Sequence, residues 1–179
     1  MEALDRLSIR PASADDTDVL HSILVDCGTE MRDRLGLTHW VPAFPRPLFE
    51  EQVAKGNVFA VGDRKSGELV ATFTLSRDVP PFCDSSLWSK AGEPALYMTH
   101  LAVRPGDQRR GIGRRCVAHA EHICSVEGLR SLRFDALAEH EALLRFYARL
   151  GFLEVGRYEV FAREMVAFEK RISSRASRR

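Results

Sequence analysis

Residues 103–114, with the sequence Val-Arg-Pro-Gly-Asp-Gln-Arg-Arg-Gly-Ile-Gly-Arg, constrain the fold of this chain more than any other stretch. An apolar run comes before them, a Pro-Gly turn interrupts the chain at Pro105, and an amphipathic run follows. This order predicts a strand, a tight turn and a helix. Gly111 and Gly113 stand in the first residues of the expected helix, where the lack of a Cβ lets another molecule approach the backbone closely.

A turn of this kind is suited to binding an anion. The amides at a helix N-terminus have no partner within the helix and carry partial positive charge. Arg109, Arg110 and Arg114 add cations around the same turn, so the arrangement favours a diphosphate. The dinucleotide-binding fingerprint needs a third glycine where this chain has Cys116, and the Gly-Lys-Ser/Thr sequence of ATP-binding loops is absent. An ordinary strand-to-helix turn with solvated arginines is the alternative.

The remaining sequence alternates strand-like and helix-like segments without a repeat. The expected strands are Leu7–Arg10, Val58–Val61, Leu69–Leu75, Ala95–Arg104, Leu132–Ala136, Leu153–Tyr158 and Met165–Lys170. One helix is expected after Ser13 and others over Leu48–Lys55, Ile112–Glu127 and Glu141–Leu150, with loops at Gly36–Pro47 and Asp78–Pro94. Together they predict an α/β fold of the mixed (α+β) type. Its mixed, mostly antiparallel twisted sheet would have about six to seven strands, with about four helices on its faces.

The composition favours one cytoplasmic domain. With 179 residues and 45% apolar content the chain can form a single core, expected over residues 1–171. Residues 172–179 are expected to be a frayed basic tail, with a nucleic-acid-binding arm as the alternative. Lys plus Arg (26) nearly balances Asp plus Glu (25), which argues against nucleic-acid and membrane partners. No apolar run approaches the ~20 residues that span a bilayer, and the N-terminus is unlike a signal peptide. Four cysteines without a C-x-x-C pair suggest reduced, mostly buried thiols.

Two motifs together resemble those of the GNAT superfamily of N-acetyltransferases. The first is Gln108-x-x-Gly111-x-Gly113 after a strand, which resembles the acyl-CoA signature of that family. The second is an aromatic-rich helix ending in Leu-Gly-Phe, present one strand and one helix further on as Phe146-Tyr147-Ala148-Arg149-Leu150-Gly151-Phe152. The similarity covers Ala95–Phe152, and the residues before it match only in the order of elements. It implies an enzyme that transfers an acetyl group from acetyl-CoA to an amine, without a metal.

The resemblance also implies roles for individual residues. In the family, the strand before the turn and the strand after its helix splay apart around the pantetheine arm, which implies backbone contacts from Leu101, Ala102 and Val103. The diphosphate would contact Arg109, Arg110, Gly111, Ile112, Gly113 and Arg114. Tyr147 would protonate the departing thiolate, with a core aromatic position as the alternative. Many relatives carry an asparagine where this chain has His140, so a cofactor contact from that position would differ in geometry.

The reaction needs a neutral amine, because an ammonium group has no lone pair with which to attack a thioester. For a lysine-like pKa near ~10, deprotonation at neutral pH costs about 4 kcal/mol, which a general base would lower. The candidates are Asp135, at a position where some relatives carry an acidic base, and His100, beside the pantetheine segment. The alternative for Asp135 is a salt bridge to Arg133 or Arg157, and for His100 a hydrogen-bonded core position.

The acceptor amine is set by segments that the resemblance does not cover. A small molecule and a peptide fit equally well, and exposed sheet edges leave a homodimer open. Thr38-His39-Trp40 and the Asp78–Pro94 segment, with Phe82 and Trp88, offer aromatic side chains that either line an acceptor site or form a satellite core cluster. Two other functions stay open: a catalytically silent acyl-CoA-binding regulatory module of the same fold, and a nucleotide-binding protein whose turn takes ATP or NAD.

Overall fold

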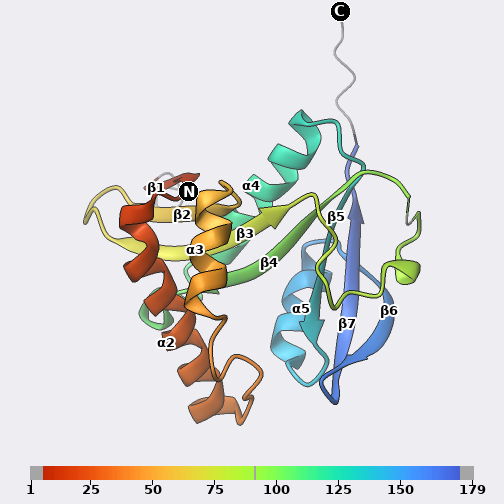
Figure 1. Ribbon diagram of the computed structural model, residues 1–179, viewed down its shortest axis with the longest axis horizontal. Coiled ribbons are helices and arrows are strands. Elements are labelled where there is room, and N and C mark those ends of the chain that lie inside the picture. The colour runs from red at the N-terminus through yellow and green to blue at the C-terminus, as the bar shows by residue number, and fades with distance from the viewer. Residues whose placement is uncertain (1–5, 91, 174–179) are drawn as a thin grey trace, which may run out of the picture. The chain divides into compact units, whose positions relative to one another are not determined.

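The computed structural model describes residues 6–90 and 92–173, and within them it confirms the expected mixed α/β fold (Figure 1). The strands are β1 (Leu7–Pro11), β2 (Val58–Asp63), β3 (Leu69–Ser76), β4 (Ala95–Val103), β5 (Ser131–Leu137), β6 (Leu153–Val160) and β7 (Arg163–Arg171). The helices are α2 (Thr17–Leu35), α3 (Arg46–Ala54), α4 (Ile112–Val126) and α5 (Glu141–Arg149), with the short 3-10 turns η1 (Ala14–Asp16), η2 (Ser85–Leu87) and η3 (Pro105–Asp107).

Backbone pairing orders the strands β1-β2-β3-β4-β5-β7-β6 in a seven-stranded sheet. The pairs β1–β2, β2–β3, β5–β7 and β6–β7 are antiparallel, whereas β4 and β5 are parallel. The described residues divide into two compact units, which we call unit 1 (residues 6–75 and 100–119) and unit 2 (residues 76–90, 92–99 and 120–173). Strand β4 and helix α4 each contribute residues to both units.

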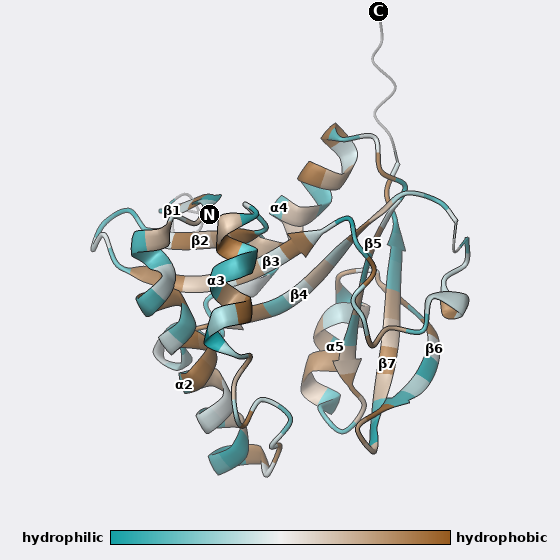
Figure 2. Ribbon diagram, viewed as in Figure 1, coloured by the Kyte–Doolittle hydropathy of each residue, from teal (hydrophilic) through white to brown (hydrophobic). Residues whose placement is uncertain are grey.

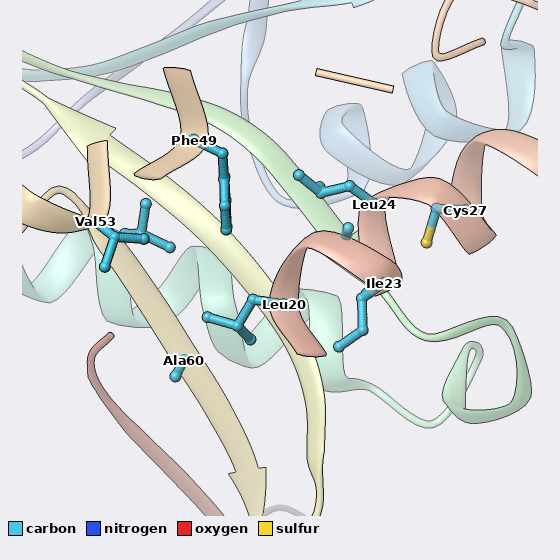
Figure 3. Close-up of a cluster of buried hydrophobic side chains, with 9 residues drawn as sticks. Leu20, Ile23, Leu24, Cys27, Phe49, Val53 and Ala60 are labelled. Atoms are coloured by element: carbon cyan, nitrogen blue, oxygen red, sulfur yellow. The ribbon is translucent and has the colours of Figure 1, made fainter. Parts of the chain in front are cut away.

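In unit 1, helices α2 and α3 share one apolar core with strand β2 (Figure 3). The hydropathy of α2 alternates along its ribbon in Figure 2, because residues three and four apart point into this core while the others face solvent. Burying one such side chain contributes about 1.5–3 kcal/mol. The buried members are Leu20, Ile23, Leu24, Cys27, Phe49, Val53, Val58, Ala60 and Ala102.

The loop after α2 packs closely against that helix at Gly28. A Cβ at Gly28 would lie 2.4 Å from the carbonyl oxygen of Trp40, so only glycine allows this approach. Trp40 and Phe44 of the loop then pack against the core of unit 1. This contact fixes two aromatic side chains close to strand β4.

In unit 2, strand β7 lies between β5 and β6, and the two faces of these strands carry different side chains. Successive residues of a strand point to opposite faces. Phe134 and Phe168 pack with Tyr147 of α5 on one face. Arg133 and Asp135 belong to the other face, which carries the polar groups described below.

The sequence placed the strands within a few residues, and its clearest error concerns the loop after α2. We expected a loop through Pro47, but α3 begins at Arg46 with Pro45 as its N-cap. Pro47 falls in the first turn of α3, where proline is tolerated because an amide hydrogen at that position would have no acceptor in the helix. The capping box of Ser13 and Asp16 is confirmed, although it caps the N-terminus of η1, the short 3-10 turn before α2. Most of the expected tail, residues 174–179, lies outside the described residues, and the single-domain boundary stays a prediction.

Candidate active site

The turn before α4, in unit 1, has the backbone geometry of an anion cradle. On either side of Arg110, Arg109 has a φ of 61° and Gly111 a φ of 82°. Alternating left-handed residues turn successive amides toward one point. The Arg115 amide donates to the Gly111 carbonyl at 3.1 Å, so the amides of residues 112–114 are the first of α4 and have no acceptor in the helix. Gly111 therefore also serves a conformational need, because its positive φ disfavours a side chain.

The three arginines of the cradle differ in their partners. Arg110 donates from Nη1 to the buried carboxylate of Asp107 at 2.6 Å, and Arg104 donates from Nε to the same carboxylate at 2.6 Å. Arg109 and Arg114 are exposed, and neither side chain forms an ion pair with a residue that the structure describes. Arg109 and Arg114 are therefore available to an incoming anion, whereas Arg110 also ties the turn to Asp107.

Strand β4 enters the cradle at Val103, whose carbonyl oxygen already has two donors. The Cys27 thiol donates to this oxygen at 3.1 Å, and the Gln108 side-chain amide does so at 3.1 Å. Gln108 thus closes the turn against the end of the strand, which gives the motif's glutamine a structural role. Backbone contacts from Leu101, Ala102 and Val103 to a pantetheine arm stay a prediction.

His100 is half-buried in unit 1 and has a φ of 52°, which is uncommon for a residue with a Cβ. Its ring lies 4.1 Å from that of Phe44 and 6.4 Å from that of Trp40, measured between centroids. Burial lowers the pKa of His100 to about 4, so the imidazole is neutral at pH 7. Its Nδ1 is buried and has no hydrogen-bond partner among the described residues. The packing matches the core alternative, but the expected hydrogen bond is missing at this atom.

Asp135 of β5 accepts a hydrogen bond from the Tyr158 hydroxyl of β6. Burial raises the pKa of this carboxyl group, and the hydrogen bond from Tyr158 acts in the opposite direction. The salt-bridge alternative is wrong: Arg133 pairs with Glu169 at 2.9 Å, and Arg157 pairs at 2.7 Å with Glu154. Asp135 is thus a half-buried carboxyl group with no cation partner among the described residues, a setting that strengthens a base.

Tyr147 is buried in unit 2, with 5% of its surface exposed. Its ring lies 4.2 Å from that of Phe134 and 6.2 Å from that of Phe152, between centroids. The aromatic motif of α5 therefore helps to form the core of unit 2. This packing agrees with the core alternative and leaves the acid role of Tyr147 a prediction.

His140 is the N-cap of α5, a role that the motif comparison missed. Its Nδ1 accepts from the Leu143 amide at 3.3 Å. Burial lowers the pKa of His140, which keeps the accepting nitrogen unprotonated. A cofactor contact from His140 stays a prediction, and Nδ1 is already engaged in the cap.

The segment between β3 and β4 folds over the polar face of unit 2. Trp88 is 3% exposed, and its ring lies 5.4 Å from the guanidinium carbon of Arg133. Arg133 also donates to the Lys90 carbonyl at 2.8 Å, so its buried pair with Glu169 fastens the segment. Trp88 therefore belongs to a satellite core cluster, the second of the two alternatives. Phe82 differs, because 60% of its surface is exposed.

Phe82 has its aromatic contact with Phe161, in the turn between β6 and β7. The ring centroids are 5.0 Å apart in an edge-to-face arrangement, and Phe161 is 78% exposed. Phe161 and Ala162 both have positive φ, at 49° and 60°. Such a turn normally favours glycine or asparagine, so this position holds an exposed aromatic ring against the local backbone preference.

The predicted site residues fall in both units. Unit 1 holds the cradle, the end of β4 and His100, whereas unit 2 holds Asp135, His140 and Tyr147. Sequence reasoning missed Tyr158 and Cys83, which lies beside the Tyr158 hydroxyl and whose pKa burial raises to about 11. The register of β6 against β7 brings Tyr158 within two residues of the position opposite Asp135, and this register cannot be read from β6 alone.

Residues 6–90 and 92–173 contain no group of three or more His, Cys, Asp or Glu side chains that is placed to hold a metal ion. None of the helices in those ranges is long and apolar enough to cross a membrane. All four cysteines are free thiols, and Cys27, Cys116 and Cys124 are buried.

Comparisons with known proteins point to one family. The profile of the acetyltransferase (GNAT) family matches residues 19–152. The uncharacterized N-acetyltransferase YesJ of Bacillus subtilis is 28% identical over 165 residues, covering 88% of this chain and 89% of that protein.

Solved structures share the fold. A GNAT-family acetyltransferase from Listeria monocytogenes matches with a TM-score of 0.76 at 18% identity, covering 92% of this chain and 94% of that one. NAA60 from Arabidopsis thaliana, solved in complex with a bisubstrate analogue, matches with a TM-score of 0.70 at 20% identity, covering 94% of this chain and 99% of that one. Since the family profile spans well over half of the sequence and includes both motifs, this chain belongs to the acetyltransferase (GNAT) family.

Proposed function

We propose that this protein transfers an acetyl group from acetyl-CoA to a primary amine of a small molecule or a peptide. The observation that carries the proposal is the cradle before α4. Its first-turn amides, its left-handed residues and the exposed Arg109 and Arg114 suit the diphosphate of coenzyme A. Membership of the GNAT family supports the chemistry and the cosubstrate. The pantetheine arm would then run beside β4, next to the backbone of Leu101 and Ala102.

The transfer is a direct displacement within a ternary complex. The amine nitrogen attacks the thioester carbonyl carbon, a C–N bond forms, and the C–S bond breaks as the tetrahedral intermediate collapses. The amine loses its proton to a general base, and the departing thiolate of coenzyme A gains one from a general acid. Holding both substrates together removes much of the entropic part of the barrier.

Asp135 is the proposed general base. Burial raises its pKa and no described cation pairs with it, and both features strengthen a carboxylate as a proton acceptor. His100 is a weaker candidate, because burial among Phe44 and Trp40 lowers its pKa to about 4. An imidazole with so low a pKa is a weak proton acceptor at pH 7.

Tyr147 is the proposed general acid. It lies in the motif of α5 that resembles the family's landmark, and a phenol hydroxyl is a chemically suitable proton donor for a departing thiolate. We propose that the apolar part of the acceptor contacts Phe82 and Phe161, whose rings are exposed and do not belong to the core.

The test is release of the coenzyme A thiol from acetyl-CoA with polyamines, aminoglycosides, amino acids and peptide N-termini as acceptors. Turnover with one class supports the proposal and identifies the acceptor. Tyr147→Phe should lower kcat, whereas the control Tyr97→Phe, in the same unit, should not. Normal turnover by Tyr147→Phe would remove the acid role from this residue. Calorimetric binding of acetyl-CoA without turnover on any amine would favour the silent regulatory module instead.

A further inference from the structure

Asp135 and Tyr158 come from strands that are not neighbours. Strand β7 runs between them, with Ala167 opposite Asp135 on one side and opposite Gly156 on the other. Two strand spacings of about 4.8 Å each therefore separate the backbones of β5 and β6. Tyr158 follows two residues after Gly156, opposite Met165, so its side chain reaches Asp135 diagonally across β7. Ala167, which is fully buried and carries only a methyl group, belongs to the cluster against which Tyr158 packs.

The surroundings of Tyr158 hold its ring in place. It packs against the buried cluster of Trp88, Ala95, Tyr97 and Ala167. Leu87 of η2 lies over β6 at Gly156, where an added Cβ would be 2.7 Å from a Leu87 methyl carbon. The ring is thus confined, and its hydroxyl points at the Oδ2 atom of Asp135.

The other titratable groups of this face are engaged elsewhere or stay neutral. Arg133 of β5 and Glu169 of β7 pair with each other at 2.9 Å. The Tyr97 hydroxyl of β4 accepts from Arg133 at 3.1 Å. Burial raises the pKa of Tyr158 far above neutrality and that of Cys83 to about 11, so both keep their protons. Tyr158 is therefore a hydrogen-bond donor to Asp135 throughout the pH range in which the carboxyl group titrates.

We infer that Tyr158 is a positioning residue for the general base: its hydroxyl holds Oδ2 of Asp135 and leaves Oδ1 to take the proton of the acceptor amine. The inference rests on the proposed role of Asp135. A hydrogen bond that is donated to a carboxylate favours the ionised form. Tyr158 thereby keeps the half-buried carboxyl group of Asp135 ionised, and so able to accept a proton, at a lower pH than burial alone would allow.

The test compares two tyrosine variants of the full chain. Tyr158→Phe removes the hydroxyl that contacts Asp135 and keeps the ring. Tyr97→Phe is the matched control, because it removes a hydroxyl from the same face that bonds Arg133 instead. The carboxyl carbon of Asp135 is titrated by carbon NMR in each protein, with its signal identified by its loss in Asp135→Asn. The pH dependence of kcat/KM is measured on the same samples.

Of the two tyrosine variants, only Tyr158→Phe should shift the titration of the Asp135 signal to higher pH. Its kcat/KM on the acid limb should fall about tenfold, as expected for losing one hydrogen bond to a charged group. The rates should converge with those of the wild type at high pH. Ala167→Val, which inserts a branched side chain between the two groups, should change the titration in the same direction and covers the case that Tyr158→Phe does not fold.

Identical Asp135 titrations in the wild type and both test variants would overturn the inference. If the titration midpoint of Asp135 shifts to higher pH while the acid limb of kcat/KM is unchanged, Asp135 is not the general base. The inference about Tyr158 would then also be wrong. Thiol release by the wild type does not depend on either outcome. A failure of the proposed acetyl transfer is therefore recognised separately.

Discussion

The cradle in unit 1 and the polar face of unit 2 are built in opposite ways. The cradle uses backbone amides and exposed arginines from consecutive residues, 108–114. The polar face uses buried and half-buried side chains from four strands and from the segment after β3, with the Arg133–Glu169 pair at 2.9 Å and the Tyr158–Asp135 bond among its contacts. We therefore expect substitutions in the cradle to act mainly on cosubstrate binding. Substitutions on the polar face should act on catalysis and stability.

The largest expected effect is that of Asp135→Asn, which removes the proposed base. We expect kcat to fall about 10²–10⁴-fold, the usual contribution of a general base, with little change in acetyl-CoA affinity. Steady-state kinetics and calorimetry measure the two quantities. Asp78→Asn, which alters an exposed carboxylate of the same unit, is the control. Wild-type turnover by Asp135→Asn would show that the polar face of unit 2 does not supply the general base.

Breaking the buried ion pair should have the next largest effect. Arg133→Met leaves Glu169 in the interior without its cation, and such a change typically lowers the free energy of unfolding by about 3–5 kcal/mol. Urea denaturation measures this loss. Arg157→Met removes a solvent-exposed pair with Glu154 and should change stability little. Equal losses in the two variants would mean that the buried pair does not fasten the segment over this face.

Charge reversal in the cradle tests whether substitutions in this turn act on cosubstrate binding. Arg109→Glu should raise the KM for acetyl-CoA at least about tenfold with an unchanged melting temperature, because its side chain has no described ion-pair partner to lose. Arg110→Glu should raise the KM and also lower the melting temperature, since it repels Asp107. Arg64→Glu, an exposed arginine in the β2–β3 turn, is the control. An unchanged KM in both cradle variants would contradict a diphosphate site here.

The smallest effect is expected at the exposed aromatic pair. Phe161→Ala removes a ring that is 78% exposed, so stability should hardly change. An aromatic contact with the acceptor is worth about 0.5–1.5 kcal/mol, so the KM for the acceptor should rise about two- to tenfold. Phe161→Tyr keeps the ring and should behave like the wild type. An acceptor KM that is the same in Phe161→Ala would place the acceptor's apolar part elsewhere.

The same contrast explains which features could be predicted from the sequence. Consecutive residues encode the cradle, so its glycines and arginines are recognisable from the sequence alone, and so are the strand and helix that flank it. Asp135 could be singled out on its strand, but its partner Tyr158 lies 23 residues away and reaches it across β7. That contact depends on strand register and on the small Ala167, which no local pattern records.

Two further features lie beyond the sequence for similar physical reasons. The sequence leaves Trp88 open between the acceptor site and the core, and only its burial against Arg133 separates the two. The sequence also does not show that Nδ1 of His140 caps α5 through the Leu143 amide. Both features depend on the direction that a side chain takes from the backbone. A single sequence carries little information about that direction.

The central claim is that the backbone amides before α4 bind the diphosphate of coenzyme A. A crystal structure of the protein grown with coenzyme A tests it most directly. We expect diphosphate oxygens within hydrogen-bond distance of the amides of residues 112–114, with the guanidinium groups of Arg109 and Arg114 close by. A diphosphate bound elsewhere, or a cradle filled by the protein's own side chains while the ligand is present, would contradict the claim.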